Sequence, residues 1–149
     1  MQLSTRLRDH ADAIVTEAAQ AIGQARLHHY DQIGPEATQE RLRRLLDAVI
    51  ASLEDATPMN MVGHAERVAQ DRFHAGVGIG EIQVAFNALE ESLWRLLLQE
   101  SPSDRLADDL GRVGSVLGAG KDHLARTYVQ LASRGHHPCV DVEALNQVV

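Results

Sequence analysis

The chain has 149 residues and a formal net charge of −7, and 44% of its residues are hydrophobic. That length fits one folded domain, and the balance of residue types excludes a disordered chain. The negative charge repels the phosphates of nucleic acids and of anionic membrane surfaces, so we expect neither as a partner.

The first half of the chain predicts two helices, because hydrophobic residues recur there in steps of three and four. The first helix is predicted over residues 4–26, with Ser4 as its N-cap. Residues 27–34 break the pattern. Pro35 then suits the first turn of a second helix, which should run to about Asp55.

The second half predicts three more helices. After a turn at residues 55–58, a third helix runs to about Ala75. It is stopped by three glycines within five residues: Gly76, Gly78 and Gly80. The fourth helix is the most hydrophobic and ends at residues 101–103. Its Trp94 is either a buried core residue or an interface anchor, and we favour the core. Ser103 caps a fifth helix that reaches about Ser133.

These elements predict one all-α domain, a compact bundle of five to six helices in which the last two form the core seam. We expect residues 1–133 to form the helical domain. Residues 134–149 are expected to be a C-terminal tail or a short helix.

The fifth predicted helix contains four glycines in its interior: Gly111, Gly114, Gly118 and Gly120. Each costs about 0.5–1 kcal/mol relative to alanine, so a structural reason is expected. Gly114 and Gly118 are four residues apart and share a helix face, which predicts an interface where another backbone approaches closely. A kink, or two shorter helices meeting near Gly118 and Gly120, explains the glycines equally well.

The chain has eight histidines, some of which are candidate metal ligands. Asp71 and His74 share a helix face, but a di-iron bundle needs a second such pair and further carboxylates. A helical-bundle metalloprotein is therefore an alternative, and a solvated helix face is the favoured interpretation. In the tail, His136, His137 and Cys139 offer three zinc ligands, one short of a structural site.

No catalytic arrangement is legible, and we predict that the chain is not an enzyme. Glu90 and Glu91 are adjacent, so they diverge by about 100° on a helix and do not form an acid/base pair. The glycines of residues 76–80 follow a helix and lack the ending of a phosphate-binding loop.

The cellular compartment is predicted by elimination. Cys139 is the single cysteine, so no internal disulfide forms and nothing points to an oxidising compartment. The first ten residues lack the apolar stretch of a signal peptide. We therefore expect a cytoplasmic protein.

Residues 64–133 carry a resemblance to a known family. The resembling features are the step from Arg72 to Gly76, Glu81 at the start of an aliphatic helix, and a closing helix that ends in Leu124-Ala125-Arg126-Thr127-Tyr128. This stretch resembles the N-terminal sensor domain of the RsbR/RsbRD-type stressosome regulators, the RsbT co-antagonist family. The first half of the chain matches only by its helix pattern.

The resemblance implies a globin-like helical fold that typically lacks haem, forms dimers and receives a signal for an attached output domain. The length leaves no room for such an output, so a stand-alone sensor or an isolated domain is expected. The leading hypothesis is a non-enzymatic module of stress-response regulation, a homodimer that contacts a regulatory protein partner. A small apolar ligand in a cavity between helices is a further expectation.

The main prediction is that the chain binds no cofactor. The globin-like relationship makes haem an alternative. In globin-coupled sensors the proximal histidine lies a few residues before a glycine-aliphatic step such as Gly76-Val77. Arg72 occupies that place here, and a shift of register would make His74 the haem ligand. The alternative function is thus a haem-binding gas or redox sensor that uses His74.

Overall fold

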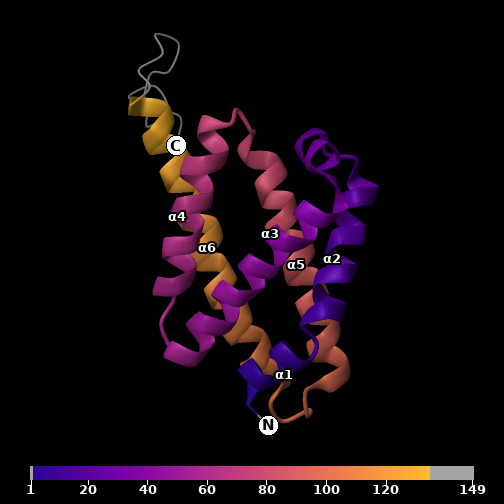
Figure 1. The fold of residues 1–149 in the computed structure, drawn as a ribbon. Helices are drawn as coiled ribbons and strands as arrows, with labels where there is room; N and C mark the ends of the chain where they lie inside the picture. Colours follow the sequence, from indigo (N-terminus) through magenta and orange to yellow (C-terminus); the bar gives the residue numbers. More distant parts are fainter. Residues whose placement is uncertain (1, 135–149) are drawn as a thin grey trace.

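The computed structural model describes residues 2–134, which form an all-helical bundle with no strand in that range (Figure 1). The prediction of an all-α fold is confirmed. Of the predicted tail, only Arg134 lies within the described residues. The helices are α1 (Leu3–Asp9), α2 (Ala11–Ala25), α3 (His28–Asp55), α4 (Met59–His74), α5 (Ile79–Glu100) and α6 (Leu106–Arg134).

The long helix α6 packs against α4, α5 and α3, while α2 packs against α3 and α5. A hydrophobic stripe of α5 is buried along the length of the helix. Its members are Ile82, Phe86, Leu89, Leu93 and Leu97. They meet buried residues of α6 such as Leu117 and Leu124 in one core, as expected for amphipathic helices that bury their apolar faces. None of the described helices combines the length and apolar character that a bilayer span needs.

The N-terminal segment differs from the prediction of one helix. The chain breaks at His10, whose φ of −107° and ψ of 13° are not helical, so α1 and α2 are separate helices. Nδ1 of His10 lies 2.9 Å from the carbonyl oxygen of Arg6, a local bond that competes with helix continuation. Ser4 is buried inside α1, and Gln2 occupies the N-cap instead.

The predicted break at residues 27–34 is narrower than expected. Arg26 takes a left-handed conformation and ends α2, and the chain is helical again from His28. Gly34 has φ of 87° and ψ of 171°, which kinks α3 immediately before Pro35. The hydroxyl of Thr38 donates a hydrogen bond of 2.8 Å to the carbonyl of Gly34, which fixes this kink.

The glycines of α6 have different surroundings, and α6 runs through all of them as one helix. A Cβ atom at Gly120 would lie 2.7 Å from Sδ of Met61 and 3.1 Å from Cε2 of Phe86, so glycine is required there for α4 and α5 to approach. A Cβ atom at Gly114 or Gly118 would meet no atom within 4 Å. The close approach within the monomer is therefore at Gly120.

Candidate functional site

His74, the residue proposed for haem, lies exposed in the last turn of α4. Its Nδ1 is 2.6 Å from the carbonyl oxygen of Gln70, and its ring meets the ring of Phe73 edge-on. Asp71 is 67% exposed and pairs with the neighbouring Arg72. The two side chains thus face solvent.

The surroundings of His74 do not fit a haem. It borders a shallow depression of about 480 Å³ that it shares with Arg67, Gln70, Asp71 and Leu131. Most of these groups are polar, whereas haem needs apolar walls. Within residues 2–134, no three His, Cys, Asp or Glu side chains gather as a metal would require. His136, His137 and Cys139 lie outside the described residues.

Gly114 and Gly118 lie on an open part of α6, where the interface prediction stays a prediction. Gly118 is exposed and Gly114 is half-buried. The ion pair between Lys121 and Glu90, at 2.8 Å, sets the register between α6 and the neighbouring α5. The two helices α5 and α6 run in opposite directions (Figure 1).

Trp94 corrects the expectation that it belongs to the core. Its side chain is 45% exposed, and Leu98, one turn further along α5, is 61% exposed. The α5 stripe that faces the core is already filled by its aliphatic residues and Phe86. Trp94 and Leu98 therefore form an exposed apolar strip on α5.

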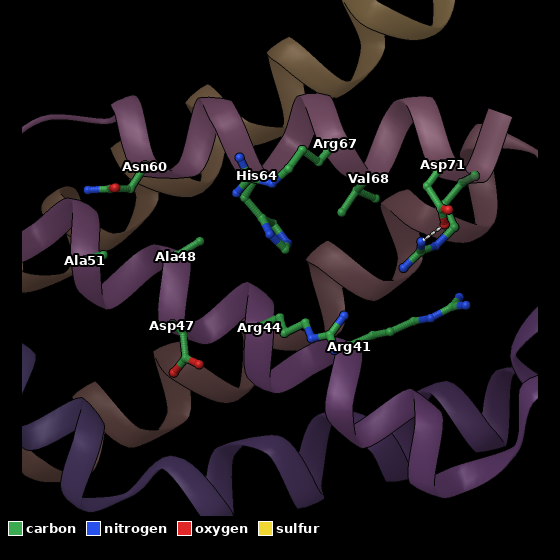
Figure 2. A pocket seen from close by; sticks show the side chains of 11 residues that line it. Arg41, Arg44, Asp47, Ala48, Ala51, Asn60, His64, Arg67, Val68 and Asp71 are labelled. Carbon is green, nitrogen blue, oxygen red and sulfur yellow. Dashed lines mark hydrogen bonds and ion pairs between the residues drawn. The ribbon is translucent and has the colours of Figure 1, made fainter. Parts of the chain in front are cut away.

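A charged cleft lies between α3 and α4, and we call it the arginine cleft (Figure 2). Its volume is about 580 Å³. His64 points from α4 into the space that faces α3, as Figure 2 shows. The side chains that line the cleft are Arg41, Arg44, Asp47, Ala48 and Ala51 of α3 and Asn60, His64, Arg67, Val68, Asp71 and Arg72 of α4.

Helical spacing brings these residues together. Arg41, Arg44 and Ala48 follow one another in steps of three and four on α3, and His64, Arg67 and Asp71 do the same on α4. The small residues Ala48 and Ala51 leave room between the two helices. The sequence contained this periodic polar stripe, but nothing in it indicated that the two stripes face each other.

The cleft is positively charged in an otherwise acidic chain. Four arginines line it against two aspartates, a formal net charge of +2 with His64 neutral. Arg44 pairs with Glu40, and Arg72 pairs with Asp71. Arg67 has no carboxylate within ion-pair distance among residues 2–134. The cleft therefore holds more positive charge than its own carboxylates neutralise.

Burial and the excess positive charge of the cleft lower the pKa values of His64 and Arg41. Burial, together with the charges of Arg67, Arg72 and Arg44, lowers the pKa of His64 to about 4, so its imidazole is neutral at pH 7. Burial and then the charge of Arg72 lower the pKa of Arg41 as well.

The hydrogen bonds of the cleft are also incomplete. Arg41 donates to Nε2 of His29 at 2.5 Å instead of to a carboxylate. Nε of Arg72 is buried and has no hydrogen-bond partner among the described residues. Buried donors normally have partners, so this one marks a place where a bound acceptor would fit.

Beneath the cleft lies a small internal void of about 30 Å³. Arg41, His64 and Arg72 border both spaces, and the rest of the lining is mostly apolar, with Ile82 and Phe86 among it. A void of this size has room for about one water molecule. This void is too small for the small apolar ligand expected from the sequence, which stays a prediction.

The comparisons with known proteins give one result. The model of the family described as RsbT co-antagonist protein rsbRD N-terminal domain matches residues 8–139, most of the chain. Searches of the curated proteins and of the solved structures returned no significant match.

Proposed function

The chain belongs to the family of RsbT co-antagonist rsbRD N-terminal domains, and from this premise we propose that it is a non-enzymatic module of stress-response regulation. In this proposal it works as a homodimer whose contacts with a regulatory protein partner depend on a signal. A cytoplasmic location is part of the same proposal. The family membership supports the regulatory role, and the dimer and the partner are our extension of it.

The observation that supports the proposed dimer is the exposed face of α5 and α6. Trp94 and Leu98 expose large apolar side chains, which bind strongly when a partner covers them. Gly114 and Gly118 place no side chain in the space beside them. A second copy can thus bring its own helix close to α6 while it covers the tryptophan.

A dimer of this kind offers a simple route for signalling. Two copies that meet through a narrow glycine face can adopt two packings that differ by a few kcal/mol, and a signal that favours one packing shifts the population. The partner would then recognise the surface that one packing exposes. No reacting group is needed for this mechanism.

The experiment compares the molar mass of three proteins by light scattering: the wild type, Gly118→Leu and Gly23→Leu. Gly23 is an exposed helical glycine of α2 where an added Cβ also meets no atom within 4 Å, so it controls for the substitution itself. We expect the wild type and Gly23→Leu to be dimers and Gly118→Leu to be a monomer. A monomeric wild type, or a Gly118→Leu dimer as tight as the wild type, rejects the interface.

A further inference from the structure

We propose that the arginine cleft binds a small organic phosphate, a phosphate monoester on a compact body, through the guanidinium groups of Arg41, Arg67 and Arg72. This site goes beyond the proposed function, because it is on the α3–α4 side of the bundle and does not involve the glycine face.

The first argument is charge. The lining carries a formal net charge of +2. A phosphate monoester carries a charge of about −1.5 to −2 at pH 7, so one such group neutralises the excess.

The second argument is the direction from which the donors come. Arg41 and Arg44 belong to α3, whereas Arg67 and Arg72 belong to α4, so arginines line both walls of the cleft. A phosphate presents three terminal oxygens in a tetrahedral arrangement, and these can accept from several arginines at once. A planar carboxylate has one oxygen fewer, and both of its oxygens lie in one plane, so it matches donors from opposite walls less well.

The third argument is that an anion would offset two unfavourable features of the cleft, namely repulsion between arginines and a buried donor without a partner. Arg41 and Arg72 are near enough that the charge of Arg72 lowers the pKa of Arg41. Nε of Arg72 is buried without a partner in the described part of the chain. A bound phosphate satisfies such donors and screens the repulsion between the two guanidinium groups.

The fourth argument is size. At about 580 Å³ the cleft is much larger than a phosphate ion and falls within the range of small-molecule pockets, about 300–1,000 Å³. Ala48, Ala51 and Val68 add apolar surface, and Asn60 adds an amide. These groups suit the organic body of the ligand, with the phosphate held at the arginines.

Binding would connect α3 and α4 through one ligand. Because α4 also has the most extensive packing against α6, a phosphate that draws α3 and α4 together acts on the helix that carries Gly114 and Gly118. The ligand can therefore bias the packing of the proposed dimer.

The test is isothermal titration calorimetry at low salt with glycerol 3-phosphate as the monoester probe and with succinate and inorganic phosphate as comparison anions. We expect glycerol 3-phosphate to bind more tightly than either comparison anion. Arg41→Gln and Arg67→Gln should each weaken its binding by about tenfold or more, because each removes a charged hydrogen bond.

The matched control is Arg43→Gln. Arg43 is on the same helix as Arg41 and carries the same charge, but it pairs with Asp12 of α2 and does not line the cleft. This variant should bind glycerol 3-phosphate as the wild type does. Thermal unfolding of each variant shows that it is folded before its affinity is compared.

A second readout uses the wild type alone and so does not depend on how the variants fold. Proton NMR follows the ring of His64 as pH is changed, with and without glycerol 3-phosphate. Glycerol 3-phosphate is still an anion in the acidic range where His64 takes up its proton, and a bound anion favours the imidazolium, so the pKa of His64 should rise when the probe is bound.

Four results overturn the proposal. They are the absence of binding at millimolar glycerol 3-phosphate, equal affinity for succinate or inorganic phosphate, an equal loss in Arg43→Gln, and a His64 pKa that the probe leaves unchanged. None of these results depends on whether the chain is a dimer, so the site and the proposed interface can fail separately.

Discussion

Arg6 of α1 and Asp109 of α6 form an ion pair with an N–O distance of 2.6 Å in the interior of the bundle. Asp109 is fully buried, and the side chain of Arg6 is 13% exposed. Ser101 joins them, because its hydroxyl accepts from Arg6 at 3.0 Å and donates to Asp109 at 2.8 Å. The network ties the N-terminal helix to the corner between α5 and α6 (Figure 1).

Removing one partner of this pair should destabilise the fold strongly. Burial opposes the charge of Asp109, but hydrogen bonds from Arg6 and Ser101 outweigh it and hold the pKa of Asp109 below its usual value. Arg6→Leu leaves that buried carboxylate without its cation, at a cost of about 3 kcal/mol in the free energy of unfolding. Urea denaturation measures the loss.

Arg8→Leu is the matched control for Arg6→Leu, since Arg8 is on the same helix. Its ion pair with Glu54 is exposed, with 54% and 40% of the two side chains accessible. Exposed pairs contribute little, so the free energy of unfolding should hardly change. Equal destabilisation by the two substitutions would show that burial of the Arg6 pair does not matter.

Gly120→Ala should destabilise the protein although alanine is the better helix former. The new methyl group would lie 2.7 Å from Sδ of Met61 and 3.1 Å from Cε2 of Phe86, and both neighbours are buried. Overpacking of this kind costs about 1–3 kcal/mol. Urea denaturation of Gly120→Ala is the measurement.

Gly111→Ala, on the same helix, is expected to raise the stability of the protein. A Cβ atom there meets nothing within 4 Å, so the substitution should stabilise by about 0.5–1 kcal/mol through helix propensity. If Gly120→Ala stabilises as Gly111→Ala does, Met61 and Phe86 adjust without cost and glycine is not required at this crossing.

The bundle could be predicted from the sequence because it depends on local patterns. Steps of three and four located α4, α5 and α6 to within a few residues, and the glycines after His74 marked the correct break. The split at His10 was missed because no glycine or proline marks it; the break coincides with the bond between the His10 ring and the carbonyl of Arg6. Trp94 was misplaced since its residue type favours burial while its helix face does not.

The arginine cleft could not be predicted, because its two walls are separate helices. Arg41 and Arg67 are each typical of a solvated helix face when read along the chain. Only the packing of α3 against α4 turns two such faces toward each other and buries His64 between them. Clusters of this kind depend on tertiary contacts, which a pattern within one helix does not contain.

Haem titration tests the alternative assigned to His74. The ring is exposed, and the depression beside it is lined mainly by polar groups. We therefore expect no visible absorption band that depends on this residue when purified protein is titrated with haemin. A stoichiometric band in the wild type that disappears in His74→Ala would establish haem binding and contradict this expectation.

His64 should make the stability of the fold depend on pH. Its folded pKa is about 4, against 6.5 for the free side chain, so the unfolded chain binds more protons between these values. Above about pH 6.5 the ring is neutral in both states, and His64 does not reduce the free energy of unfolding. As pH falls from 6.5 toward 4, this free energy decreases by up to about 1.4 kcal/mol per pH unit. The charged groups that line the cleft with it are Arg41, Arg44 and Asp47 of α3 and Arg67, Asp71 and Arg72 of α4.

His64→Gln isolates this contribution, because glutamine keeps a polar side chain but does not titrate. Denaturant unfolding at several pH values between 7 and 4 should show a shallower decline for His64→Gln than for the wild type. His28→Gln, which changes an exposed histidine at the start of α3, should keep the decline of the wild type. If His64→Gln loses stability with falling pH as steeply as the wild type does, the imidazole of His64 takes up its proton in the folded cleft, and the arginines beside it do not exclude that charge.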